Sequence, residues 1–171
     1  HLSIRRQRQM CIRDSLKTSV GKIATVSGRY YAMDRDKRWE RVQLAYDALV
    51  NAKGPTANSA LDSIRENYAK DITDEFIKPT VIVENGAPIA SIQNGDAVLC
   101  FNFRTDRCRE ITEVLSQKDF PEFGMQKLDL HYTTITKYDE TFKQVNVIFE
   151  NDNLVNTCLL YTSPSPRDAH E

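Results

Sequence analysis

The sequence predicts an α/β protein, a layered sandwich with a mixed, mostly parallel sheet, of which this chain forms part of a domain. Three observations support this class. Short runs rich in β-branched residues alternate with segments whose apolar residues recur at helical spacing. Residues 97–103 are almost continuously apolar, which is typical of a strand buried on both faces. No internal repeat or low-complexity linker interrupts this order.

The first half of the chain contains one expected strand and two expected helices. Residues 22–26 form a short β-branched run that ends at a Ser-Gly pair. Residues 37–52 show helical spacing and stop at a Gly-Pro pair. Residues 57–70 predict a second helix, with Thr56 or Asn58 as its N-cap. The apolar residues expected on one face of this second helix are Leu61, Ile64 and Tyr68.

The second half predicts more strands and one more helix. Asn85-Gly86 is a tight-turn signal, and residues 89–92 would follow it as a short partner strand or a loop. The apolar run 97–103 leads into a helical pattern from Arg104 to Lys118. The remaining expected strands are residues 80–84, 128–136 and 145–149.

The composition is that of an ordinary globular protein. Of the 171 residues, 40% are hydrophobic and 27% are charged, which excludes a disordered or collagen-like chain. No apolar run approaches the roughly 18 residues that cross a bilayer, and the charged opening stretch lacks the apolar core of a signal peptide. We therefore expect a cytoplasmic protein that binds neither membrane nor nucleic acid.

The two ends of the chain are expected not to be native. Residues 10–15 can be encoded by ATG TGT ATA AGA GAC AG, and the opposite strand of that DNA, read one frame over, encodes residues 158–162. The surrounding residues resemble translations of the two arms of a sequencing adapter. We therefore assign residues 1–15 and 158–171 to adapter DNA and exclude them from fold reasoning. Residues 16–157 are the expected native segment.

This exclusion changes the charge and the candidate chemistry. Of the 23 basic and 24 acidic residues, the excluded ends hold five and three, so the native segment carries a net charge of about −3. Only one of the three histidines, His131, remains, so a histidine-built metal site or nucleophile cannot be assembled within this segment. Cys100 and Cys108 lack metal-ligand spacing and are interpreted as reduced packing residues.

Arginines gather at two expected strand ends, where α/β proteins place their ligands. Arg29 and Arg35 follow the first strand, and Arg104 and Arg107 follow the apolar run. Guanidinium groups bind phosphate or carboxylate oxygens in pairs, and a helix beginning near Arg104 would add backbone N–H groups. The alternative is that Arg35 and Arg107 form weak surface salt bridges with neighbouring aspartates. Spacing alone leaves both interpretations open.

Three more charged residues follow the first arginine motif. The expected helix carries them near its start, and we interpret them as a solvated face. These residues are Arg38, Glu40 and Arg41.

Two stretches resemble a known family. Residues 21–42, GKIATVSGRYYAMDRDKRWERV, resemble the signature of the cofactor-independent (2,3-bisphosphoglycerate-independent) phosphoglycerate mutases. Residues 102–107, NFRTDR, resemble the second arginine motif of that family, at the expected distance downstream. The native segment then corresponds to the later part of the phosphotransferase domain, about a quarter to a third of a full-length enzyme.

The resemblance implies an isomerase of glycolysis and gluconeogenesis that interconverts 3-phosphoglycerate and 2-phosphoglycerate through a phosphoserine. It implies two manganese ions, no 2,3-bisphosphoglycerate, a small-molecule substrate and a monomeric, cytoplasmic parent. The substrate-binding residues that it implies here are Arg29, Arg35, Arg104 and Arg107.

The catalytic serine and the metal ligands of that family belong to parts absent from this chain. We therefore expect no catalytic or metal-binding residue here and no mutase activity from the chain alone. The alternative that the residues leave open is a stand-alone phosphate-binding module without catalysis.

Overall fold

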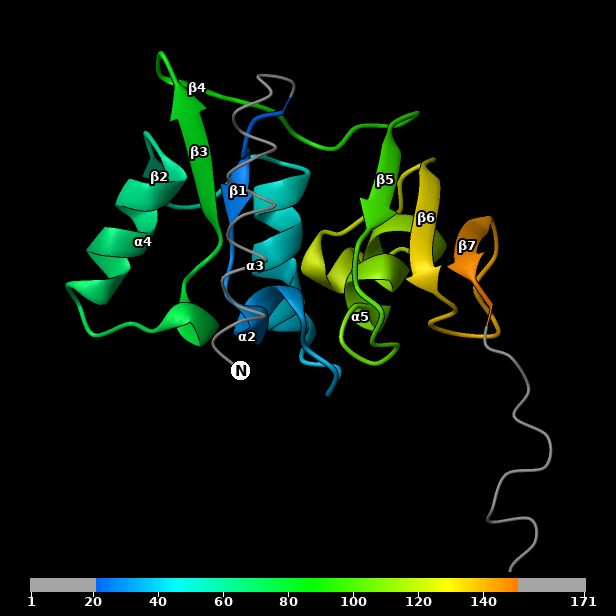
Figure 1. The fold of residues 1–171 in the computed structure, drawn as a ribbon. Coiled ribbons are helices and arrows are strands. Elements are labelled where there is room, and N and C mark those ends of the chain that lie inside the picture. The colour runs from blue at the N-terminus through cyan, green and yellow to red at the C-terminus, as the bar shows by residue number, and fades with distance from the viewer. Residues whose placement is uncertain (1–20, 151–171) are drawn as a thin grey trace, which may run out of the picture.

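The computed structural model describes residues 21–150 and confirms the α/β class (Figure 1). The strands are divided between two sheets, one of mixed direction and one parallel, rather than collected in one. The predicted boundaries of the native segment fall in residues 1–20 and 151–171, outside the described residues, so they stay predictions.

The first sheet is built around β3 (Thr80–Glu84), which pairs with three other strands. Strand β1 (Thr25–Val26) is antiparallel to β3, and β2 (Thr56–Ala57) is parallel to it. Asn85 and Gly86 both have positive φ, as a tight hairpin turn requires, and lead into β4 (Ala87–Pro88). Residues 89–92, expected as a short partner strand or a loop, form a loop, and the partner strand of β3 lies directly after the turn.

The second sheet is parallel and has the order β5-β6-β7. These strands are Ala97–Cys100, His131–Thr136 and Val145–Phe149, so all three were predicted, the last with the bounds observed. Between β5 and β6 the chain forms α5 (Arg109–Thr112), the π-helical turn η2 (Glu113–Gln117) and the 3-10 turn η3 (Pro121–Phe123).

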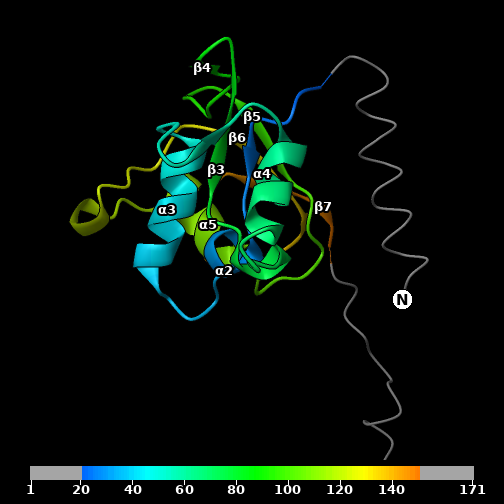
Figure 2. The ribbon, with the colours of Figure 1, turned by 90° about the vertical axis from the view of Figure 1, so that its left-hand side faces the viewer.

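Helix α3 (Trp39–Leu49) connects the two halves of the molecule. It contacts β3 on one side and α5 and η3 on the other, and Figures 1 and 2 show it opposite α4 across β3. Its spacing of apolar residues puts one face into the main core, which explains why this helix was predicted well. The buried members of that core are Val42, Ala45, Tyr46, Cys108, Ile111, Val114, Leu115, Met125, Leu130, Tyr132 and Tyr138.

The second predicted helix begins later and packs differently from the prediction. Helix α4 (Ala60–Tyr68) is capped by Ser59, whose Oγ accepts a hydrogen bond from the Asp62 N–H, and not by Thr56 or Asn58. Thr56 instead pairs with β3. The expected apolar face is also wrong, because Leu61 and Tyr68 are exposed. Two shorter helices are α2 (Arg29–Ala32) and η1 (Asp74–Phe76).

The apolar run 97–103 is not buried on both faces. Only its first four residues form a strand, at the edge of the second sheet, and Leu99, Phe101 and Phe103 are 56%, 84% and 64% exposed. The helix expected from Arg104 begins at Arg109 after a turn at residues 105–108, and this turn contacts Met33 and Arg35 in the loop after Ala32. No helix among residues 21–150 is long and apolar enough to cross a membrane.

Candidate functional site

The first arginine motif begins where the backbone passes very close to η1. The Gly28 N–H donates to the Ile77 carbonyl (2.8 Å), and a Cβ on Gly28 would lie 2.3 Å from the Glu75 carbonyl oxygen. Only glycine fits this approach. It sets Arg29, the first residue of α2, beside Glu75, and their side chains form an ion pair with an N–O distance of 2.6 Å.

The Arg29–Glu75 pair lines a cavity of about 830 Å³. The Glu75 carboxylate holds the pKa of Arg29 above its ordinary value, so the guanidinium is firmly charged. The other residues that line this cavity are Tyr68, Asp71, Ile72, Thr73 and Asp74. Two aspartates and Glu75 make this cavity acidic, and Arg29 is the one basic side chain among the described residues that line it.

Asp34 organises the loop between α2 and α3. Its residue exposure is 7%, and its Oδ2 accepts hydrogen bonds from the backbone N–H groups of Asp36 and Arg38, both at 3.0 Å. Its Oδ1 lies 3.8 Å from the guanidinium nitrogens of Arg38 and Arg41. Burial acts to raise the pKa of Asp34, but the two backbone hydrogen bonds and Arg38 outweigh it and keep the pKa low.

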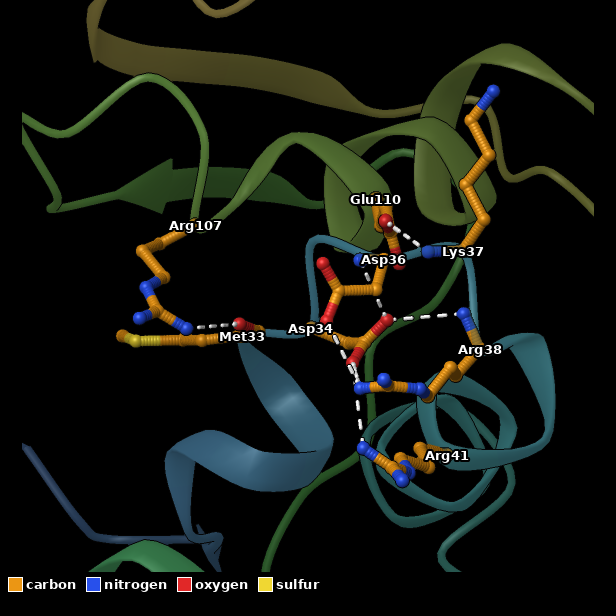
Figure 3. Close-up of polar contacts among 8 residues, drawn as sticks. All are labelled: Met33, Asp34, Asp36, Lys37, Arg38, Arg41, Arg107 and Glu110. Atoms are coloured by element: carbon orange, nitrogen blue, oxygen red, sulfur yellow. Dashed lines mark hydrogen bonds and ion pairs between the residues drawn. The ribbon is translucent and has the colours of Figure 1, made fainter.

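Glu110 reaches the same loop from α5. Its Oε1 accepts a hydrogen bond from the Lys37 N–H (2.8 Å), while its buried Oε2 accepts none. Figure 3 shows the Glu110 carboxyl on one side of Asp34 and the Arg38 and Arg41 guanidiniums on the other. Burial raises the pKa of Glu110 to about 7, and the neighbouring Asp34 charge adds to this shift.

The second arginine motif contacts the first directly. The Arg35 Nη1 donates to Asp106 Oδ2 (3.2 Å), and the Arg107 Nη1 donates to the Met33 carbonyl (3.4 Å; Figure 3). The Arg35 hydrogen bond lowers the pKa of Asp106. The structure therefore agrees with part of each interpretation of the sequence. Arg35 forms a surface ion pair with an aspartate, and this ion pair links the two arginine motifs.

Arg104 is exposed, and within residues 21–150 its side chain forms no ion pair. Its backbone N–H donates to the Asn102 side chain (3.2 Å), which shapes the turn after β5. The structure therefore brings the segments of Arg35 and Arg107 together. Arg104, three residues before Arg107, is exposed to solvent. Arg29 is paired with Glu75 of η1. The backbone N–H groups of a helix start do not lie at Arg104, because α5 begins five residues later.

Arg41 was predicted to lie on a solvated face, and this is wrong. Its side chain is 22% exposed, and its guanidinium stacks 3.8 Å above the centre of the Tyr30 ring while facing Asp34. The sequence signal that could have found it is the spacing of seven residues from Asp34, which spans the loop and the first turn of α3. No such local signal pointed to Glu110, because its partners are more than 70 residues away in sequence.

The chemistry available in this region is anion binding and hydrogen bonding. Among residues 21–150, no group of three or more histidine, cysteine, aspartate or glutamate side chains could hold a metal ion. Cys100 and Cys108 are free thiols, as predicted, and the Asn102 side chain donates to Cys108 Sγ (3.1 Å).

Comparison with known proteins gives a consistent result. A family model described as "BPG-independent PGAM N-terminus" matches residues 7–140. The 2,3-bisphosphoglycerate-independent phosphoglycerate mutase of Flavobacterium johnsoniae is 56% identical over 147 residues, which are 85% of this chain and 29% of that enzyme. That of Flavobacterium psychrophilum is 58% identical over 137 residues, 80% of this chain and 27% of that enzyme.

A solved structure agrees with these relatives. A crystal structure of Leishmania mexicana phosphoglycerate mutase, obtained at low cobalt concentration, matches with a TM-score of 0.67 and 28% identity, over 78% of this chain and 26% of that one. The chain thus spans less than a third of the length of the relatives it matches. On the extent of the family match, the chain belongs to the family of N-terminal regions of 2,3-bisphosphoglycerate-independent phosphoglycerate mutases.

Proposed function

We propose that this chain is the substrate-holding part of an isomerase that interconverts 3-phosphoglycerate and 2-phosphoglycerate through a phosphoserine. Arg29, Arg35, Arg104 and Arg107 are the proposed substrate-binding residues. The observation that carries the proposal is the Arg35–Asp106 contact, which joins the two arginine motifs of a chain that belongs to this family.

Arg35 and Arg107 are suited to an anionic substrate. The side chains of Arg35 and Asp106 are 54% and 44% exposed, and an exposed pair of this kind contributes little to stability. A phosphate group can therefore take the place of the Asp106 carboxylate at small cost and gain two charge-assisted hydrogen bonds from one guanidinium. Arg104, on the same loop as Arg107 and open to solvent, supplies a further cation for the carboxylate or phosphate.

Arg29 needs a different account. Its guanidinium is held by Glu75 in the acidic cavity beside η1, so its contribution to substrate binding requires exchange of that partner. The Arg29 side chain is 54% exposed, which leaves its outer nitrogens accessible to an anion. We infer that Arg29 is the last of the four arginines to engage.

The family implies manganese, and the described residues do not fit such a site. We therefore assign the two manganese ions and the nucleophilic serine to the rest of the parent enzyme and derive no step through them here. The chain's own residues hold and orient the substrate, and confining the glycerate this way favours return of the phosphoryl group to its other hydroxyl. By itself the chain is proposed to be inactive. We propose a monomeric, cytoplasmic parent.

A chimera tests the proposal. Residues 21–150 replace the matching segment of the Flavobacterium johnsoniae mutase, and interconversion of the two phosphoglycerates is measured. We expect the chimera to be active and Arg35→Ala or Arg107→Ala to lower its kcat/KM by about 100-fold, the usual loss when one donor to a charged transition state is removed.

The matched control is Arg65→Ala, which removes an exposed arginine from α4 and should leave activity unchanged. If the arginine variants equal the control, the assignment of the substrate site is wrong. If the folded chimera is inactive while the 171-residue chain alone binds phosphoglycerate saturably and loses this on Arg104→Ala, the non-catalytic binding module replaces the proposal. Turnover by the chain alone in manganese buffer contradicts its proposed inactivity.

A further inference from the structure

The loop that carries Arg35 has a backbone conformation that needs outside support. Lys37 has φ of 57°, in the left-handed region that a side chain with a Cβ rarely adopts. Two residues later the chain enters α3, so this one residue helps to set the direction in which the loop runs into that helix. The loop's own contacts with Asp34 fix the N–H groups on either side of Lys37 but not that of Lys37 itself.

Glu110 supplies the missing contact from another element. Its Oε1 accepts the Lys37 N–H at 2.8 Å, and the residue is 5% exposed. Three consecutive backbone N–H groups, of Asp36, Lys37 and Arg38, therefore end on two buried carboxyl groups from different parts of the chain. Glu110 also stands three residues after Arg107, so it ties the first arginine motif to the element that follows the second.

We propose that Asp34 and Glu110 form a positioning pair, in which neutral Glu110 shares its proton with ionised Asp34 and thereby holds Arg35 and Arg107 in one site. Neither residue is proposed to touch the substrate. The pair rests on geometry alone, whereas its consequence for phosphoglycerate rests on the proposed function.

Glu110 Oε2, which accepts no hydrogen bond, indicates which of the two carboxyl groups carries the proton. A buried carboxylate oxygen without a donor is costly, whereas a protonated Oε2 can donate to the Asp34 carboxylate beside it. The Asp34 carboxylate already accepts two backbone hydrogen bonds and lies 3.8 Å from the Arg38 and Arg41 guanidiniums. It is therefore the member of the pair that stays ionised. The pKa directions agree, since that of Glu110 is raised to about 7 and that of Asp34 is lowered.

The charged groups around Glu110 all favour this assignment. From the α2–α3 loop it faces Asp34, from η2 it faces Glu113, and both carboxylates oppose a second negative charge. The Lys37 N–H is the contact that favours ionised Glu110, and the arginines of α3 reach Asp34 instead. Above about pH 7 the two carboxylates repel each other, and the loop loses its tie to α5.

The proton on Glu110 determines whether the stability of the folded chain rises or falls with pH. The folded chain binds the Glu110 proton more tightly than the unfolded chain does, because folding raises the pKa of Glu110 from an ordinary value of 4.5 to about 7. Stability therefore falls as the pH rises through this range and is level above it. If only the protonated pair binds anion, affinity for phosphoglycerate is up to about tenfold weaker at pH 8 than at pH 6.

The experiment uses the full 171-residue chain and three readouts. The side-chain carboxyl carbon of Glu110, assigned by its loss in Glu110→Gln, is titrated by NMR, with an expected midpoint near 7. Protection of the Lys37 amide from hydrogen exchange is compared at pH 6 and pH 8. Affinity for 3-phosphoglycerate is measured at the same two values. Glu110→Gln keeps the acceptor for Lys37 and stays neutral, so its Lys37 protection should not change with pH.

The phosphate of 3-phosphoglycerate itself changes its ionisation between pH 6 and pH 8. Because this change affects binding to Glu110→Gln as well, the difference in affinity change between the two proteins isolates the contribution of Glu110. Glu110→Ala should lose Lys37 protection at both pH values, and Glu122→Gln, an exposed change on η3, should behave as the unaltered chain. If Glu110→Ala does not fold, the comparison with Glu110→Gln decides alone.

A Glu110 midpoint near its ordinary value, or Lys37 protection that falls equally with pH in the unaltered chain and in Glu110→Gln, overturns the positioning pair. If the midpoint and the protection follow the expectation but phosphoglycerate binds to none of the proteins, the pair stands and the proposed function of this chain fails. If phosphoglycerate binds and only the unaltered chain weakens with pH, both are supported.

Discussion

Strands β3 and β5 are alike in sequence and opposite in environment. Both are short apolar runs that the sequence identifies as strands. In β3, Val81 and Ile82 are 0% and 2% exposed, because β1, β2 and β4 pair with this strand and α3 packs against it. In β5, exposure alternates between the two faces: Leu99 is 56% exposed, whereas Val98 packs against the main core. Composition predicts a strand, but the elements that pack on its faces decide whether its side chains are buried.

The second sheet shows the same contrast within itself. Tyr132, on the central strand β6, is 1% exposed, and its hydroxyl accepts a hydrogen bond from Thr112. The large exposed apolar residues of this sheet lie on the two flanking strands and are Leu99, Ile148 and Phe149, whereas Val98 and Val145 on the same strands pack against the core. Phe101 and Phe103, just before and within the second arginine motif, are exposed as well.

The largest expected effect comes from truncating one residue in each of the two strands. Val81→Ala should lower the free energy of unfolding by about 2 kcal/mol, because two buried methyl groups are lost and a cavity is left. Leu99→Ala removes more atoms but should cost less than about 0.5 kcal/mol, as exposed positions usually do. Urea denaturation of both variants measures the difference. Equal losses would show that β5 is as well covered as β3.

The sequence predicted what depends on local pattern and missed what depends on distant partners. The 37–52 helix was predicted nearly to its ends because its apolar spacing matches a single buried face. The 85–86 turn was predicted because Asn-Gly favours positive φ at both positions. The second helix was less well predicted, since its apolar Leu61 and Tyr68 are exposed while Ser63 is buried.

The candidate site divides in the same way. The sequence named the arginines from their position after strands, and Arg35 does meet the second motif through Asp106. It could not identify Glu110, whose role depends on Lys37 lying 73 residues away in sequence. It also placed Arg41 in solvent, because a helix period cannot show that Asp34 and Tyr30 fold back onto that position.

The second-largest expected effect on the free energy of unfolding comes from helix α4, which packs against the first sheet. Helix α4 contacts β1 and β2, and Ser59 caps its N-terminus through the Asp62 N–H (3.1 Å). Ser59→Ala should therefore cost about 1 kcal/mol of unfolding free energy, the usual value of a lost N-cap. Thr56→Ala and Asn58→Ala, at the positions predicted as caps, are the matched controls. A larger loss from Asn58→Ala than from Ser59→Ala would restore the predicted cap.

The smallest expected effect on stability concerns Phe101, the residue directly after β5. Phe101 is 84% exposed, so Phe101→Ser should change the free energy of unfolding by less than about 0.5 kcal/mol. Its effect on association should be larger, because an edge strand with exposed aromatic residues favours contact between chains. Concentration-dependent light scattering should therefore decrease, while Phe76→Ser, which removes an exposed phenylalanine beside Tyr30 on the first-sheet side, should leave it unchanged. Equal decreases from both changes would mean that association follows exposed aromatic area in general. A decrease from Phe101→Ser alone would locate it at the uncovered edge, where β5 has one neighbour and β3 has several.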